Sequence, residues 1–177
     1  MKAAIIYWTK SGNTEKVAAA IKNSIESICD ELDYLRLEDA QDFDYFEYNL
    51  ICIGFPSYRW RPPKQVDDFL INHHNRYRKE NRIKVGSPKL TGRNVIVFCT
   101  YSGPHTGINE AIPAANYASQ YFEHLGFTIL DELYVIGEFH GSEENSTMGR
   151  LGDIRGRPNE KDLADVKQRV RELLVRI

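Results

Sequence analysis

Residues 9–14 have the side chains that hold an anion at the start of a helix. Their order is Thr-Lys-Ser-Gly-Asn-Thr, which supplies three hydroxyls and one carboxamide as hydrogen-bond donors. The apolar run 3–8 precedes the turn, and a helix-like run, 15–28, follows it. A helix start offers free N–H groups and a favourable dipole, and Gly12 lets the backbone approach a ligand. We therefore predict a phosphate site with Lys10 pointing outward and donors from Thr9, Ser11, Asn13 and Thr14.

The order of residues in this turn separates it from other phosphate motifs. It lacks both the G-x-x-x-x-G-K-S/T pattern of nucleoside triphosphatases and the G-x-G-x-x-G pattern of dinucleotide folds. All five specified positions match Ser/Thr-x-Ser/Thr-Gly-Asn-Thr, the FMN phosphate loop of flavodoxins. On these six residues the sequence resembles the flavodoxin family, and a plain helix N-cap is the alternative. The resemblance implies FMN as the cofactor.

Strands and helices alternate along the whole chain. Strands are predicted at residues 3–8, 33–37, 49–54, 94–100 and 127–136, and helices at 15–28, 62–77, 108–125 and 160–176. Gly126 is a predicted C-terminal cap and Asn159 a predicted N-cap, with Asp162 three residues on. This alternation predicts a single α/β domain over residues 1–177, a parallel sheet with helices on both faces. The flavodoxin-like three-layer sandwich has strand order 2-1-3-4-5 and binds ligands at the carboxyl ends of its strands.

Two further loops follow predicted strands and complete the expected site. The resemblance implies that they grip the flavin ring from opposite sides, with backbone N–H groups at its pyrimidine edge. Exposed aromatic side chains suit a flat ring, so Tyr58, Trp60 and Tyr101 are candidate ring contacts, although any of them could fold back onto the protein. The candidate residues of the first loop are Pro56, Ser57, Tyr58, Arg59 and Trp60, and those of the second are Thr100, Tyr101, Ser102, Gly103, His105 and Gly107.

Charge is distributed unevenly along a chain whose net charge is only −2. Residues 30–47 hold eight acidic side chains against one basic, and residues 59–93 hold ten basic against three acidic. Electron-carrying flavodoxins are commonly acidic near the flavin, whereas Arg59 and Arg61 flank the predicted ring site here. Positive charge favours a reduced, more negative flavin, so we expect a less negative reduction potential.

The remaining polar candidates carry weaker signals. His105 and His140 follow predicted strands and could lie beside the flavin or make ordinary loop hydrogen bonds. His73 and His74 are predicted to be solvent-exposed, and His124 to lie near a helix end. Segments 72–92 and 138–157 look like insertions, and residues 147–157 could cover the flavin edge or a dimer interface. Cys52 and Cys99 lie in apolar runs and are predicted to be buried.

Two functional classes follow from these features, both relying on flavin chemistry. One is an electron carrier that docks to a redox partner protein. The other is an NAD(P)H-dependent oxidoreductase that reduces a small acceptor such as a quinone. A relative of the fold that has lost its flavin is a third, non-redox class. We expect no metal, no nucleic-acid partner, no membrane span and no signal peptide, and a cytoplasmic location with reduced thiols. A homo-oligomer stays open.

Overall fold

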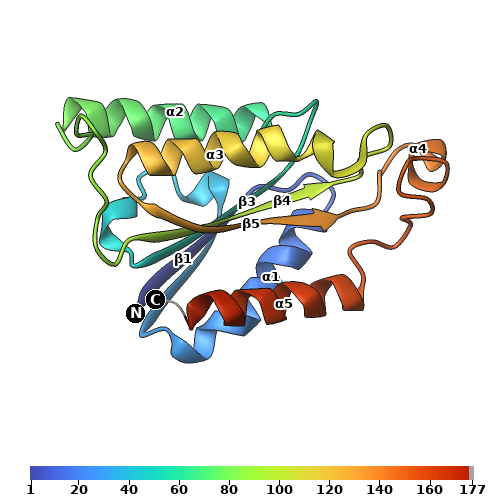
Figure 1. Ribbon diagram of the computed structural model, residues 1–177, viewed down its shortest axis with the longest axis horizontal. Coiled ribbons are helices and arrows are strands. Elements are labelled where there is room, and N and C mark those ends of the chain that lie inside the picture. The colour runs from blue at the N-terminus through green and yellow to red at the C-terminus, as the bar shows by residue number, and fades with distance from the viewer. Residues whose placement is uncertain (176–177) are drawn as a thin grey trace.

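Five parallel strands form the centre of the computed structural model, which describes residues 1–175. Their order across the sheet is β2-β1-β3-β4-β5, which confirms the predicted flavodoxin-like topology (Figure 1). The strands are β1 (Lys2–Tyr7), β2 (Glu31–Arg36), β3 (Leu50–Pro56), β4 (Asn94–Tyr101) and β5 (Thr128–Ile136). All carboxyl ends lie at one edge, where the predicted site residues meet.

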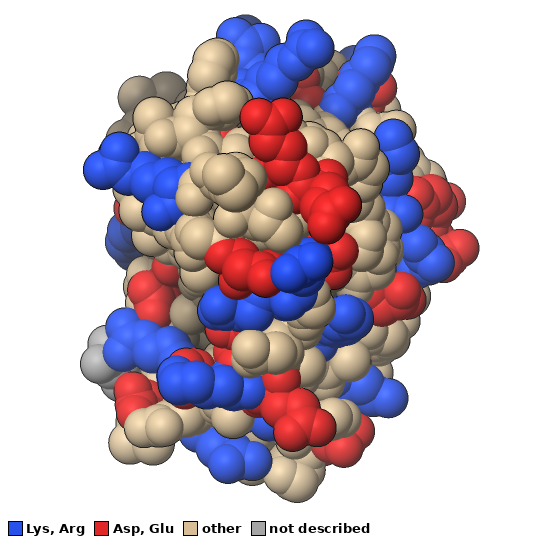
Figure 2. Space-filling model, turned by 90° about the vertical axis from the view of Figure 1, so that its right-hand side faces the viewer, with Lys and Arg blue, Asp and Glu red and all other residues tan. Residues whose placement is uncertain are grey.

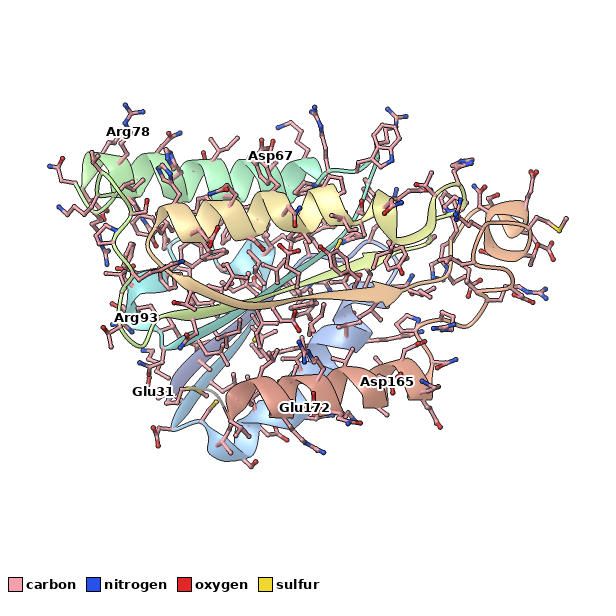
Figure 3. The ribbon with its side chains drawn as sticks, in the orientation of Figure 1. Glu31, Asp67, Arg78, Arg93, Asp165 and Glu172 are labelled. Atoms are coloured by element: carbon pink, nitrogen blue, oxygen red, sulfur yellow. The ribbon has the colours of Figure 1, made fainter. Side chains whose placement is uncertain are left out.

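Helices cover both faces of this sheet, as Figure 1 shows, with α2 and α3 on one face and α1 and α5 on the other. The three inner strands are almost entirely buried because their apolar side chains point alternately into the two layers. Ile6, Ile53 and Val97 pack toward α2 and α3. Ile5 and Cys52 pack toward α1 and α5. Side chains fill both layers (Figure 3), so the sheet edge is a rigid support for loops.

The helix bounds differ from the predicted ones mainly at their ends. The helices are α1 (Asn13–Ile25), α2 (Lys64–Lys79), α3 (Ile112–His124), α4 (Glu143–Thr147) and α5 (Glu160–Leu174). Residues 26–28 form a 3-10 turn instead of continuing α1, and residues 107–110 form another before α3. The predicted end of the last helix, Arg176, lies outside the described residues. The predicted caps are confirmed, with Gly126 at a φ of 90° and a capping box formed by Asn159 and Asp162.

Two further sequence predictions concern thiols and membranes. Cys52 and Cys99 are buried and have free thiols, as expected from their apolar surroundings. Cys29 is a third free thiol and is partly exposed. Among residues 1–175, no helix combines the length and the apolar composition that a membrane crossing requires.

The prediction that His73 is solvent-exposed is wrong. Its side chain is 3% exposed because it belongs to the buried stripe of α2 that also contains Phe69 and Tyr77. Its Nδ1 lies 2.9 Å from the Phe69 carbonyl oxygen, and its Nε2 lies 3.1 Å from the carbonyl oxygen of Phe43. Burial lowers the pKa of His73, so the ring is neutral at neutral pH.

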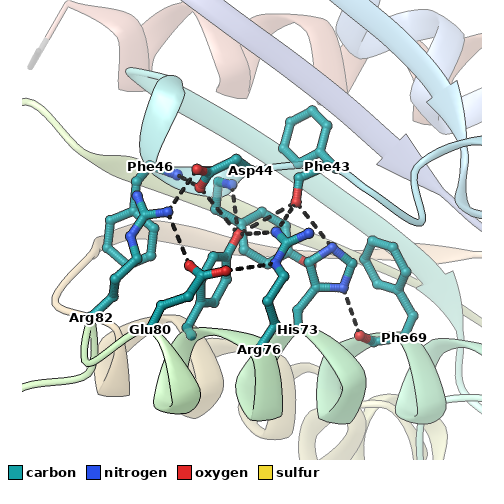
Figure 4. A network of polar contacts seen from close by, with 10 residues as sticks. Phe43, Asp44, Phe46, Phe69, His73, Arg76, Glu80 and Arg82 are labelled. Carbon is teal, nitrogen blue, oxygen red and sulfur yellow. Dashed lines mark hydrogen bonds and ion pairs between the residues drawn. The ribbon is translucent and has the colours of Figure 1, made fainter.

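The first part of segment 72–92 is therefore regular helix rather than an insertion, since α2 continues to Lys79. The loop that follows is anchored by polar contacts drawn in Figure 4. Arg82 donates to Asp44 at 2.7 Å, and its guanidinium lies over the ring of Phe46. Arg76 donates to the Phe43 carbonyl oxygen and to the Tyr77 hydroxyl. These bonds fix the chain before β3 and thus the strand that carries one of the site loops.

The buried imidazole predicts a pH-dependent stability. Because its folded pKa lies below the ordinary 6.5, protonation favours the unfolded chain, and stability falls as the pH drops below that value. One proton contributes a slope of at most about 1.4 kcal/mol per pH unit. His73→Gln keeps a donor but cannot titrate, so urea unfolding between pH 5 and pH 8 should show a flatter profile for this variant. Identical profiles for the two proteins would contradict the assignment.

Candidate functional site

The turn of residues 9–14 joins β1 to α1 and has the geometry of an anion site. Gly12 caps the helix with a φ of 92°, and its N–H donates to the Thr9 hydroxyl at 2.9 Å. A Cβ on Gly12 would have no neighbour within 4 Å, so the space above the turn is open. Lys10 and Ser11 are exposed, which confirms that Lys10 points outward.

The backbone donors of this turn remain free. Across residues 1–175, the N–H groups of Ser11, Asn13, Thr14 and Glu15 donate to no backbone or side-chain acceptor. The first bond of the helix runs from the Lys16 N–H to the Gly12 carbonyl oxygen at 3.1 Å. Unpaired amides at the positive end of a helix, beside a glycine that leaves room, fit a phosphate group.

Two side chains predicted as phosphate donors are instead engaged within the protein. The Asn13 amide donates to the Glu138 carbonyl oxygen at 3.0 Å, just beyond β5. The Thr14 and Thr100 hydroxyls lie 2.8 Å apart, so one donates to the other, and both side chains are buried. Of these two hydroxyl protons, one is left for another acceptor. Asn13 and Thr14 therefore clamp the turn to the ends of β4 and β5.

Gly137 belongs to this clamp, although sequence reasoning did not single it out. A Cβ there would lie 2.6 Å from the Asn13 Nδ2 atom, so only glycine lets the end of β5 pass so close to the turn. A glycine directly after the last strand was the available signal. His140 lies nearby, with its Nε2 3.5 Å from the Asn13 Oδ1, a weak contact at the margin of the turn.

The loop after β3 forms a small hairpin. The Tyr58 N–H donates to the Arg61 carbonyl oxygen at 2.9 Å, and the Arg61 N–H returns the bond at 3.1 Å. Arg59 and Trp60 form the tip with φ values of 51° and 65°, the signs of a type I′ turn. Such angles cost about 1–2 kcal/mol for a residue with a Cβ, so the backbone of this turn is strained at both Arg59 and Trp60.

The base of the hairpin is fixed to the rest of the site. The Ser57 N–H donates to the Thr100 carbonyl oxygen at 2.9 Å, and the Ser57 hydroxyl donates to the Glu110 carbonyl oxygen. The Tyr58 ring meets Trp8 edge-on with centroids 6.0 Å apart, and Trp8 itself is buried. Tyr58 is nevertheless 43% exposed, so one surface of its ring is open at the carboxyl end of the sheet.

The loop after β4 is shaped by two glycines with positive φ, Gly103 and Gly107. The Gly107 N–H donates to the Gly103 carbonyl oxygen at 3.0 Å, and a Cβ on Gly103 would lie 2.6 Å from the Gly107 carbonyl oxygen. The amides of His105 and Thr106 donate to the Glu110 carboxylate at 2.8 and 2.7 Å. These two amides are thus engaged rather than free for a ligand, and His105 itself is exposed.

Tyr101 lies differently from the other two aromatic candidates. It is 9% exposed and packs with the α2–α3 layer. Burial raises the pKa of Tyr101, and the positive charge of Arg157 partly offsets that rise. Ser102 donates to the Gly137 carbonyl oxygen at 2.7 Å, which joins this loop to the end of β5. Tyr58 and the phosphate turn therefore lie exposed at the carboxyl end of the sheet, whereas the Tyr101 side chain is buried.

Segment 138–157 packs over the β4 loop. It contains the short helix α4, which was not predicted from the sequence. The Arg150 backbone N–H donates to the Pro104 carbonyl oxygen at 2.8 Å. Leu151 would be 3.5 Å from a Cβ on Gly107. The segment thus supports residues 103–107 from outside.

Comparisons with known proteins agree with this architecture. The sequence model of the flavodoxin domain family matches residues 4–105. A flavodoxin of Megasphaera elsdenii is 26% identical over 97 residues, which cover 55% of this chain and 63% of that protein, less than two thirds of its length. Oxidised flavodoxin 1 of Bacillus cereus has a TM-score of 0.69 at 18% identity, covering 100% of this chain and 99% of that one. A flavodoxin of Streptococcus pneumonia TIGR4 has a TM-score of 0.67 at 16% identity, with complete coverage of both chains, 100% each. These two structural likenesses show the fold.

The contact between Gly137 and Asn13 predicts a coupled pair of substitutions. Gly137→Ala should lower the free energy of unfolding by about 1–3 kcal/mol, because the new methyl group overlaps the Asn13 carboxamide. In the Asn13→Ala background, the same change should cost clearly less, since the carboxamide is gone. Urea unfolding of the wild type, both single variants and the double variant measures the coupling. Additive effects would contradict this clamp.

Proposed function

This chain belongs to the flavodoxin family, whose members bind FMN, and from that premise we propose that it is an FMN-dependent electron-transfer protein. The observation that carries the proposal is the phosphate turn, with its unpaired amides at the start of α1. FMN, when bound, supplies redox chemistry that moves one or two electrons. The protein contributes binding, orientation and the local electric field. We further propose that residues 1–177 act as one domain.

The phosphate is proposed to lie on the backbone of the turn. The amides of Ser11, Asn13, Thr14 and Glu15 are free donors, and a dianionic group there is favoured by the helix dipole. The hydroxyls of Thr9 and Ser11 add donors, since the Thr9 oxygen accepts from Gly12 and keeps its own proton. The Asn13 side chain, already bonded to Glu138, positions the turn rather than contacting the phosphate.

The ring is proposed to lie against Tyr58. This side chain is held by Trp8 on one side and open on the other, and it flanks the turn that would hold the phosphate. The loop of residues 100–107 is proposed to face the opposite side of the ring. Tyr101 is too buried to stack on a ligand without moving, which favours Tyr58 as the aromatic contact.

A carrier is favoured over an NAD(P)H-dependent quinone oxidoreductase because the site is open. Tyr58 and Trp60 are 43% and 60% exposed, so the hairpin leaves the ring position accessible to a partner instead of enclosing a small substrate. Electron transfer requires only a short distance between two redox centres. Hydride transfer requires a substrate held at a fixed position and orientation against the flavin.

A negative charge in the turn tests the phosphate assignment. Ser11→Glu should weaken FMN binding at least about tenfold by repulsion between the two anions, because 1.4 kcal/mol suffices for that factor. Ser11→Gln, with the same length as glutamate but no charge, should lose much less FMN affinity than Ser11→Glu. Riboflavin lacks the phosphate, so its affinity for Ser11→Glu should be unchanged. Quenching of flavin fluorescence measures all six affinities, and an equal loss for both flavins would contradict the assignment.

A second prediction concerns the potential. Tyr58 and Arg61 face each other across the hairpin, so their side chains share one face of it. The Arg61 charge should therefore favour electron uptake by a ring lying on Tyr58. Arg61→Glu should lower the reduction potential by tens of millivolts, since about 59 mV corresponds to 1.4 kcal/mol for one electron. Arg171→Glu, the same charge change on α5, should leave it unchanged. A potentiometric titration without any downward shift for Arg61→Glu would refute this role.

A further inference from the structure

The strand β5 lies at one edge of the sheet, and its outer side is open. It is nine residues long and pairs with β4 alone. Figure 1 shows it along the front of the sheet, with α3 above it and α5 below it. Two hollows of about 420 and 410 Å³ lie along this edge, one bordered by α3 and one by α5, and both are lined by Asp131, Glu132 and Tyr134. We call the two hollows together the β5 groove.

Every second backbone unit of β5 points into this groove. The Gly137 N–H, directly after the strand, donates back to β4 at 2.8 Å. Parallel strands bond to a given neighbour through alternate residues, so Leu133 and Val135 also bond to β4. Tyr134 and Ile136 alternate with them, and in the described part of the chain their outward N–H and C=O groups make no hydrogen bond. A strand laid alongside β5 would therefore find two donors and two acceptors.

Only the first half of this edge is protected against pairing. The register against β4 shifts between Val95 and Ile96, which leaves Leu130 without a partner as a β-bulge. The Asp131 carboxylate then accepts the outward N–H of Glu132 at 2.9 Å. Bulges and charged side chains of this kind keep edge strands from pairing with other chains. Residues 133–136, Leu-Tyr-Val-Ile, contain neither, so the second half of the edge is open to another strand.

The two sides of the groove differ in chemistry. Leu133 and Val135 belong to the apolar cluster beneath α1 and α5, so the α5 side offers an apolar surface. On the α3 side the hydroxyls of Ser119 and Tyr134 both donate to the Glu132 carboxylate. An added strand would direct its side chains alternately to these two sides. The groove therefore suits a segment in which apolar and polar residues alternate.

Glu132 is the one carboxylate of the groove without a cationic partner among residues 1–175. Acidic and basic side chains are interspersed on the face at the carboxyl ends of the strands (Figure 2), and the other acids of the groove follow the same rule. These acids pair as Asp131 with Arg169, Asp162 with Arg157, Asp165 with Lys161, and Glu123 with Lys89. A cation brought by a ligand would therefore meet its negative partner at Glu132.

We propose that the β5 groove binds an extended segment of a partner protein as a sixth strand, in which apolar and polar residues alternate and a Lys or Arg pairs with Glu132. The inference goes beyond the proposed function, because it requires neither the flavin nor the phosphate turn. In strand addition, main-chain bonds give affinity and alternate side chains give specificity. A second copy that paired through its own β5 would fit less well, since that strand contains no Lys or Arg.

The experiment titrates the FMN-loaded protein with the blocked peptide Val-Thr-Val-Lys-Val-Thr-Val and follows the ¹⁵N–¹H NMR spectrum. The amide signals of Tyr134 and Ile136 should move to lower field, because their N–H groups gain acceptors. The signals of Leu133 and Val135, which already donate to β4, should move much less. This alternation distinguishes strand addition from a contact made by side chains alone.

Variants test the charge and the backbone separately by calorimetry. Glu132→Gln should weaken binding of the lysine peptide about threefold and leave unchanged the affinity for Val-Thr-Val-Gln-Val-Thr-Val. Glu26→Gln, the same change on the exposed 3-10 turn after α1, should alter neither affinity. Ile136→Pro removes an N–H that has no partner within the protein, so FMN binding should persist while both peptides bind about fivefold more weakly.

Four outcomes would overturn the inference. They are no binding of either peptide, shifts that do not alternate along β5, and an equal loss of affinity for both peptides in Glu132→Gln. The fourth is movement of the Tyr134 and Ile136 amide signals when the protein alone is concentrated, which would assign the edge to a second copy of the chain.

Discussion

A helix start can hold an anion only while its first amides stay unpaired, and this constraint explains the architecture around residues 9–14. The turn cannot be stabilised by its own backbone without consuming those donors. Its shape is instead fixed from the side, by Thr14 against Thr100 on β4 and by Asn13 against the carbonyl oxygen beyond β5. Gly137 is required because a Cβ at this position would overlap the Asn13 side chain. The order of the strands thus determines whether the turn can keep its amides free.

The hairpin after β3 has Tyr58 and Arg61 at its base and Arg59 and Trp60 at its tip. Tyr58 and Arg61 pair across the hairpin, and we propose that their side chains bring an aromatic surface and a positive charge to the bound ring. Arg59 and Trp60 occupy the strained tip and face solvent. Flavin affinity and reduction potential would then depend on the Tyr58–Arg61 pair.

The sequence was sufficient for the fold and for the turn, because both depend on local patterns. The runs of β1, β3 and β4 are apolar throughout, and the motif of residues 9–14 is contiguous. What it could not give are contacts between distant segments. His73 looked exposed because its neighbours are polar, and the Phe43 carbonyl oxygen that lies against its buried Nε2 comes from a distant segment. The role of Asn13 depends in the same way on Glu138, and α4 is too short for a periodic pattern.

The central claim is that the backbone of the turn binds the phosphate of FMN. Its most direct test is the ¹⁵N–¹H NMR spectrum of the protein titrated with FMN and, separately, with riboflavin. We predict that the amide signals of Ser11, Asn13, Thr14 and Glu15 move to lower field with FMN and stay nearly in place with riboflavin, since only FMN carries the anion that accepts their hydrogen bonds. Equal shifts with both flavins, or unmoved amides with FMN bound, would contradict the account.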